Sequence, residues 1–209
     1  MGKTGKGNTI ILASASPRRR ELLCRAGVDF EVVASKVSEI SGADLSPDRL
    51  VRENALLKAE DVAQSLPCRI VLGADTVVFC SGRVLGKPAD IAEARAMLSF
   101  LSGRTHTVYT GVALVEQIGR YACGRTLRRL VDATESAVTF KNLTSADIDY
   151  YLSKVDVLDK AGAYAVQEFG DFIISRIDGG LDNVMGLPCG LVMDMLKAFD
   201  AERKSGQLR

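Results

Sequence analysis

The sequence predicts a single α/β domain built on a mixed, twisted β-sheet with flanking helices, and three observations support this prediction. Apolar runs typical of strands alternate with amphipathic helical segments over the first half of the chain. Residues 104–140 change to alternating apolar and polar positions, which favour antiparallel hairpins. The 209 residues are 47% hydrophobic and 25% charged, the composition of a globular domain with a sizeable core. We place this domain at 10–203, after a flexible leader over 1–9.

The first half of the chain carries clear helix start signals. Ser16 is placed to cap a helix that begins at Pro17, and a second Ser-Pro pair, at 46–47, begins a longer amphipathic helix. The expected elements are a strand at 9–14, a helix at 17–26, a strand at 30–35, a helix at 46–66, a central strand at 69–79, and a turn with a short return strand within 80–88.

The second half begins with a helix that Asp90 caps and Gly103 ends. Thr144 and Asp147 stand at the spacing of a capping box, which predicts another helix start. The expected elements are strands at 105–116, 120–124 and 135–141, a helix at 144–154, a strand at 170–180 and a closing helix at 188–204. Residues 119–131 are expected to form a solvated basic hairpin.

Charge and cysteine usage narrow the class of protein. The chain has 27 basic and 26 acidic residues, so its net charge of +1 argues against a nucleic-acid binder and makes any anion site local. Five dispersed cysteines indicate reduced thiols and hence a cytoplasmic protein. No apolar run is long enough for a signal peptide or a membrane span, so we expect no membrane contact.

Three arginines, residues 18–20, follow the first predicted strand at the start of a helix. Cations are unfavourable there because a helix N-terminus carries partial positive charge, so their presence indicates an anion site. Successive helical residues point about 100° apart, so one ligand cannot engage all three. Arg18 and Arg19 are the better candidates and Arg20 is expected to be solvated; a merely charged helix face is the alternative.

Two charged residues occupy apolar surroundings. Lys58 lies at the flank of the apolar face of the 46–66 helix, where it either extends outward to solvent or reaches a buried anion. Asp75 interrupts an apolar strand and therefore needs a cation, a metal or a hydrogen-bond network, such as loop amides.

The remaining polar residues suggest metal-assisted phosphate chemistry. Glu39, Asp75 and Asp90 are oxygen ligands suited to Mg²⁺ or Mn²⁺, and Lys87 is expected near the same sheet edge. The chain has a single histidine, His106, so a His-rich zinc site is excluded. We expect His106 to be structural. Carboxylates beside several cations favour a metal-dependent phosphohydrolase that acts on a small anionic substrate.

Seven motifs occur in the order and spacing of the Maf (septum formation) family: "LASASPRRRELL", "ENALLKA", "VLGADTVV", "LGKPAD", "MLSFLSGRTHTVYTGV", "DKAGAYAVQ" and "NVMGLP". The chain therefore resembles this family of nucleoside triphosphate pyrophosphatases over residues 10–200. The resemblance implies an α/β fold like that of inosine triphosphatases, with two lobes around a cleft. It also implies cleavage of the α–β phosphoanhydride, with possible homodimers by analogy.

The resemblance implies roles for single residues. Asp75 looks like the general base, Lys58 and Lys87 like the phosphate-contacting lysines, and Glu39 like a metal or water ligand. Ser14 and the turn amides are expected to hold phosphate. The acidic pair usual in the family before the second helix is Ser38-Glu39 here, which puts the metal geometry in question.

The chain resembles the branch of the family that prefers dTTP and UTP. Arg18, Thr76 and Gln167 carry this resemblance, and an amide such as that of Gln167 offers a pyrimidine both a donor and an acceptor. We expect Arg18 to help select substrate and Arg19 to contribute charge. The expected role is removal of non-standard or excess pyrimidine triphosphates. A preference for 7-methyl-GTP and a nucleotide-binding role in cell division are the alternatives.

Overall fold

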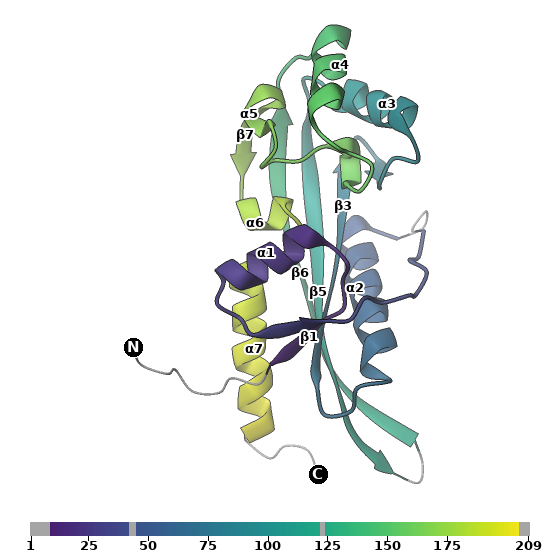
Figure 1. The fold of residues 1–209 in the computed structure, drawn as a ribbon, viewed down its shortest axis with the longest axis vertical. Helices are drawn as coiled ribbons and strands as arrows, with labels where there is room; N and C mark the ends of the chain where they lie inside the picture. Colours follow the sequence, from purple (N-terminus) through teal and green to yellow (C-terminus); the bar gives the residue numbers. More distant parts are fainter. Residues whose placement is uncertain (1–8, 42–44, 122–123, 205–209) are drawn as a thin grey trace.

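A seven-stranded mixed sheet runs the length of the molecule (Figure 1). The computed structural model describes residues 9–41, 45–121 and 124–204, so the predicted leader lies outside it except for Thr9. The strand order is β2-β1-β3-β5-β6-β7, with β4 paired to β3; the β1 pairs are parallel and the rest antiparallel. The strands are β1 (Ile10–Leu12), β2 (Phe30–Val32), β3 (Ile70–Cys80), β4 (Arg83–Leu85), β5 (Thr105–Tyr121), β6 (Gly124–Phe140) and β7 (Ile174–Asp178).

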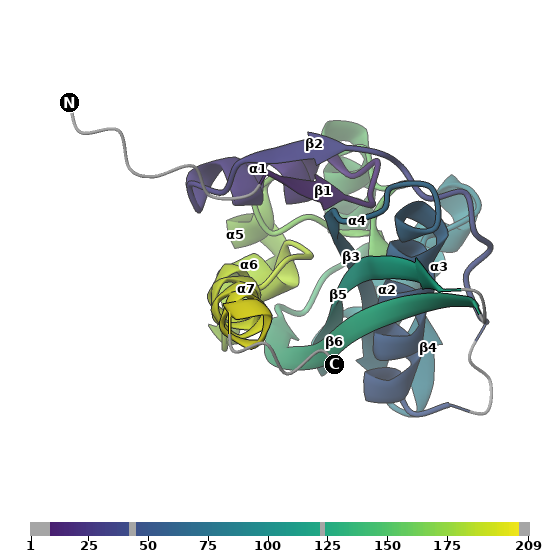
Figure 2. The same cartoon turned by 90° about the horizontal axis from the view of Figure 1, so that it is seen from below.

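Helices cover both faces of the central strands (Figure 2). Residues of β5 alternate between them: Ala113 and Val115 pack with α2, whereas Val112 and Leu114 pack with α1 and α7. Both sides of these strands are therefore apolar and buried. The helices are α1 (Pro17–Arg25), α2 (Pro47–Ala63), α3 (Ile91–Leu101), α4 (Ser145–Lys154), the 3₁₀ helix η1 (Ala161–Ala163), α5 (Gly170–Ile173), α6 (Leu181–Val184) and α7 (Cys189–Lys204).

The long strands join two lobes, as the predicted fold class requires. The first half of β3 places Leu72 and Ala74 in the core beneath α1 and α7. Its second half places Val78 in a separate core with α3, α4 and the end of β6. Figure 1 shows α3, α4 and α5 at one end of the sheet and α1, α2 and α7 toward the other. Strand β3 thus contributes side chains to the cores of both lobes and passes through the junction between them.

Two glycines let the backbone of α2 lie directly against the sheet. A Cβ atom on Gly73 would overlap the carbonyl oxygen of Ala55, and one on Gly111 would overlap that of Val51. Gly111 is the register partner of Asp75 on β5. The close approach of α2 at these two positions brings its polar residues to Asp75.

The structure corrects three predictions. Of the strand expected at 120–124, residues 120 and 121 end β5 and residue 124 begins β6, whereas residues 122 and 123 lie outside the described residues. The strand expected at 135–141 is the last part of β6, and β5 and β6 have 17 residues each. Arg128 is buried rather than solvated, with its guanidinium 3.4 Å from the Phe199 ring centroid and Nη2 3.4 Å from Glu116 Oε2. The stretch expected to be a strand from residue 170 begins instead with α5.

The helix start signals are confirmed. Ser16, Ser46 and Asp90 each accept a hydrogen bond from the backbone N–H three residues later, and Thr144 forms the reciprocal capping box with Asp147. Across the residues that the structure describes, none of the helices is both long and apolar enough to cross a membrane.

Candidate active site

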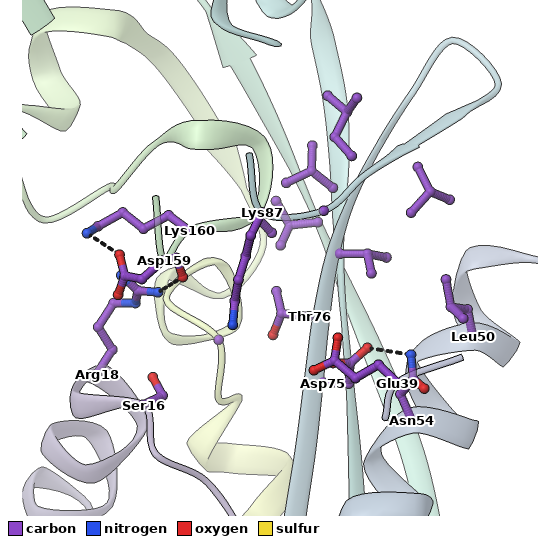
Figure 3. A pocket seen from close by; sticks show the side chains of 18 of the residues that line it. Ser16, Arg18, Glu39, Leu50, Asn54, Asp75, Thr76, Lys87, Asp159 and Lys160 are labelled. Atoms are coloured by element: carbon purple, nitrogen blue, oxygen red, sulfur yellow. Dashed lines mark hydrogen bonds and ion pairs between the residues drawn. The ribbon is translucent and has the colours of Figure 1, made fainter. Parts of the chain in front are cut away.

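A cleft of about 1050 Å³ opens where the two lobes meet (Figure 3). It is lined by the β1–α1 turn, the loop after β2, α2, the middle of β3, the β4–α3 loop and segments near 159–167 and 184–186. The predicted residues that line it are Ser14, Arg18, Arg19, Glu39, Lys58, Asp75, Thr76, Lys87 and Gln167. Residues from distant parts of the sequence therefore converge as the site prediction requires.

Lys58 joins two carboxylates in the cleft. Its Nζ lies 2.6 Å from Asp75 Oδ1 and 2.6 Å from Glu39 Oε1. Asp75 is buried, and its other oxygen accepts a hydrogen bond from Asn54 Nδ2 at 3.3 Å. Of the two orientations open to Lys58, the structure shows the inward one. A shared cation and an amide thus stabilise the carboxylate that interrupts the apolar strand.

The cations around Glu39 keep this carboxyl ionised. Burial raises the pKa of this carboxyl, but the hydrogen bond and charge of Lys58, with smaller contributions from Lys87 and Arg19, outweigh burial and lower the pKa below its usual value. Glu39 therefore faces the cleft as an anion at neutral pH.

A polar stripe on α2 holds this loop in place. Asn54, Lys58 and Asp61 are spaced i, i+4 and i+7, which puts them on one face of the helix. Asn54 clamps both backbone groups of Ile40, with Oδ1 accepting from its N–H at 2.8 Å and Nδ2 donating to its carbonyl at 3.3 Å. Asp61 accepts from Ser35 Oγ at 2.8 Å and from the N–H of residue 36 at 2.9 Å. Sequence reasoning missed Asp61, which the i, i+4 and i+7 spacing on α2 could have found.

The β1–α1 turn directs Arg19 into the molecule. Arg19 Nε donates to the Gly186 carbonyl at 2.8 Å. Its Nη1 donates to Ser14 Oγ at 3.3 Å, and its Nη2 donates to Thr76 Oγ1 at 3.1 Å. Arg18 instead pairs with Asp159 across the cleft, at 3.3 Å between Nη1 and Oδ2. Arg20 is exposed, as expected. Arg19, expected to supply only charge, is thus the arginine that contacts Thr76.

Lys87 and Asp90 both follow β4, but only Lys87 is among the described residues that line the cleft. Figure 3 shows the Lys87 side chain reaching between Thr76 and the start of α1. Asp90 is not among the described residues that line the cleft, and its Oδ1 accepts from the Glu93 N–H at 2.8 Å. The expectation that Asp90 joins the other carboxylates is therefore wrong, because this side chain caps α3.

Sequence comparison identifies the family of this chain. The family described as Maf-like protein matches residues 9–199. The chain belongs to the Maf family. Its relatives include proteins named dTTP/UTP pyrophosphatase from Akkermansia muciniphila, 48% identical over 91% of this chain and 95% of the relative, and from Moorella thermoacetica, 48% identical over 92% and 96%.

Comparison of folds agrees with the predicted fold class. The Ham1 protein of Staphylococcus aureus superposes with a TM-score of 0.50, over 91% of this chain and 99% of the other. Sequence identity is only 16%, so this similarity concerns the fold alone.

The oxygen ligands fit a divalent cation that is partly held by substrate. Glu39 and Asp75 lie on either side of the Lys58 nitrogen, so two carboxylates face the cleft close to one another. No cluster of three acidic, histidine or cysteine side chains suited to a metal occurs in the described part of this Maf protein. Mg²⁺ is commonly bound by one or two carboxylates together with substrate phosphates, and the pair suits that arrangement.

His106 is buried in the lobe that contains α3 and α4. Its Nε2 is 2.9 Å from the Tyr164 hydroxyl, and its ring packs edge-on against Phe140 and Tyr164. Burial lowers its pKa to about 4, so the ring is neutral at physiological pH. Its position agrees with the structural role expected of it.

Proposed function

We propose that this Maf protein is a nucleoside triphosphate pyrophosphatase that hydrolyses dTTP and UTP, and related modified pyrimidine triphosphates, to the monophosphate and pyrophosphate. The observation that carries the proposal is Lys58 bridging Glu39 and Asp75 in a cleft that also presents Arg18, Arg19 and Lys87. The names of its relatives support the reaction and the pyrimidine substrates.

The proposed reaction needs a positioned water and neutralised phosphate charge. Asp75 orients a water molecule and takes its proton as the oxygen attacks the α-phosphorus. The bond from this phosphorus to the α–β bridging oxygen breaks, and pyrophosphate leaves with that oxygen. Lys58 and Lys87 stabilise the charge that develops on the phosphate oxygens.

A divalent cation, Mg²⁺ or Mn²⁺, would be held by Glu39 and Asp75 and would supply further charge neutralisation to the triphosphate. Asp75 thus has two assigned roles, as a ligand and as the proton acceptor. Ser14, Thr76 and Gln167 are proposed to contact substrate. A homodimer and a cytoplasmic location stay predictions.

A substrate panel tests the proposal. Purified protein is assayed with dTTP, UTP, CTP and 7-methyl-GTP, in Mg²⁺ or Mn²⁺, and the products are separated to distinguish pyrophosphate from orthophosphate. We expect pyrophosphate, with dTTP and UTP preferred. Asp75→Asn should lower kcat by about 10²–10⁴-fold and leave nucleotide binding intact, whereas Asp90→Asn, a matched change outside the cleft, should leave kcat unchanged.

Two outcomes would contradict the proposal. Release of orthophosphate would mean that a different anhydride bond is cleaved. Full complementation of a null strain by the inactive Asp75→Asn variant would mean that nucleotide binding, not turnover, is the biological role.

A further inference from the structure

Arg19 lines the cleft and is held there by three hydrogen bonds. Its Nε donates to the Gly186 carbonyl, and its two terminal nitrogens donate to Ser14 and Thr76. A guanidinium has five N–H donors, and the described residues accept from three of them, so one N–H on each terminal nitrogen is left for a ligand. Burial lowers the pKa of Arg19, whereas the charge of Asp75 raises it, so the guanidinium lies within the field of the proposed general base.

The bond from Nε sets the direction of these two N–H groups. Nε carries a single proton and the guanidinium is planar, so a fixed acceptor for that proton limits rotation of the whole group. The acceptor is the carbonyl of Gly186, in the turn between α6 and α7, whose φ of +105° favours glycine. The orientation of Arg19 therefore depends on what holds this turn in place.

Asn183 of α6 fastens the turn to the sheet. Its Nδ2 donates to the Val108 carbonyl at 3.1 Å and to Ser136 Oγ at 2.9 Å. Its own backbone carbonyl accepts from the Gly186 N–H at 2.9 Å and from Thr110 Oγ1 at 3.1 Å. Asn183 is 1% exposed and is not among the described residues that line the cleft. It is thus joined to Arg19 through Gly186, without lining the cleft itself.

Ser136 on β6 completes this anchor. Its Oγ accepts from Asn183 and donates to the Gly180 carbonyl, which directly precedes α6, at 3.1 Å. The backbone lies close here, since a Cβ on Gly179 would be 2.6 Å from Ser136 Oγ. A helix of four residues has little stability of its own, so these bonds to the sheet determine where α6 and the turn after it lie.

We infer that Asn183 is a positioning residue for Arg19: it fixes the turn whose Gly186 carbonyl orients the guanidinium toward the phosphate groups of the substrate. An arginine that is oriented before the substrate arrives loses less conformational freedom on binding, and its charge is already in place as the reaction proceeds. The inference rests on the proposed function and deepens it, because it assigns part of the phosphate-binding geometry to a residue behind the wall of the cleft.

A double-mutant cycle with dTTP as substrate tests this route. Asn183→Ala removes both side-chain hydrogen bonds, so we expect kcat/KM to fall about tenfold as Arg19 loses its orientation. Ser136→Ala removes one of them, and we expect a fall of about threefold. If both residues act through Arg19, neither change should lower kcat/KM by more than about twofold in the Arg19→Ala background. A merely structural role would give the same factor in both backgrounds.

Ser102→Ala is the matched control for Ser136→Ala. Ser102 Oγ also accepts one hydrogen bond and donates another, both with the backbone of Leu143, and Ser102 is not among the described residues that line the cleft. We therefore expect kcat/KM to be unchanged in Ser102→Ala.

Two kinetic outcomes would overturn the inference and leave the proposed function intact: equal factors in the two backgrounds, or an unchanged kcat/KM in folded Asn183→Ala. Failure of the wild-type protein to hydrolyse dTTP or UTP would overturn the proposed function instead.

Hydrogen exchange of the Arg19 Nε–H, followed by NMR, provides a readout that does not depend on activity. Exchange should be faster in Ser136→Ala than in the wild-type protein or in Ser102→Ala, because the Gly186 carbonyl is held less firmly. Should Asn183→Ala not fold, Ser136→Ala carries both the kinetic cycle and this measurement. Equal exchange rates in the three proteins would overturn the positioning role.

Discussion

Replacing Lys58 with methionine removes the cation that Asp75 and Glu39 share. The loss of Lys58 destabilises Asp75 more than Glu39, because the Asp75 side chain is only 7% exposed and keeps one hydrogen bond, from the Asn54 amide. Removing one member of a buried ion pair commonly costs about 3–5 kcal/mol. Glu39 adds little, since its side chain is 53% exposed and water can replace the lysine. We expect Lys58→Met to lower the free energy of unfolding by about 3 kcal/mol.

The charge argument is isolated by a double-mutant cycle. Asp75→Asn removes the carboxylate but leaves Lys58 paired with Glu39, so we expect a loss of only about 1 kcal/mol. The double variant has neither buried charge and should be more stable than Lys58→Met alone, which implies a coupling energy of about 2 kcal/mol.

Urea unfolding at pH 7, without divalent cations, measures all four proteins. A coupling energy below about 0.5 kcal/mol would refute the reasoning, because it would mean that solvent already screens the pair. The same series has a second readout, the Glu39 carboxyl. Since burial raises its pKa and Lys58 lowers it, Lys58→Met should shift this pKa upward in an NMR titration.

Three further predictions concern the rest of the molecule. His106 has a pKa of about 4 when folded and about 6.5 when unfolded, so the unfolded chain binds more protons between these two pH values. The free energy of unfolding should therefore fall by up to ~3 kcal/mol as the pH drops from about 6.5 to 4. In the His106→Gln variant, the urea midpoint should lose that share of its pH dependence. Gly111→Ala should destabilise by about 3 kcal/mol, because the new methyl group overlaps the Val51 carbonyl; an unchanged urea midpoint would contradict the close packing of α2 on β5. Asp61→Ala should lower kcat/KM about fivefold, because it loosens the loop that carries Glu39. Glu53→Ala on the exposed side of α2 should have no such effect, and equal effects of the two changes would show that the loop is held elsewhere.

Local interactions explain what could be predicted from the sequence. Helix starts depend on a side chain and a backbone N–H three residues away, so Ser16, Ser46 and Thr144 could be recognised without the rest of the chain. The helix at 91–101 was found for the same reason. The motifs also predicted residues that line the cleft, because all of the predicted site residues except Asp90 are found there.

Strand extent was less predictable because pairing is non-local. Strands β5 and β6 continue as far as each has the other as a partner, through basic residues that alone suggested a solvated hairpin. Arg128 is buried because Phe199, which lies 71 positions later, packs against its guanidinium. No pattern near residue 128 contains that information.

The sequence by itself determined the starts and caps of the longer helices and the residue types available to the site, because each depends on residues within a few positions of one another. Only the tertiary structure decided that Lys58 turns inward and that Arg19 rather than Arg18 meets Thr76. Each of these outcomes depends on which backbone lies opposite the side chain. The contacts that decide them join residues far apart in the chain, and they exist only once α2 and the Gly186 turn have packed against β3.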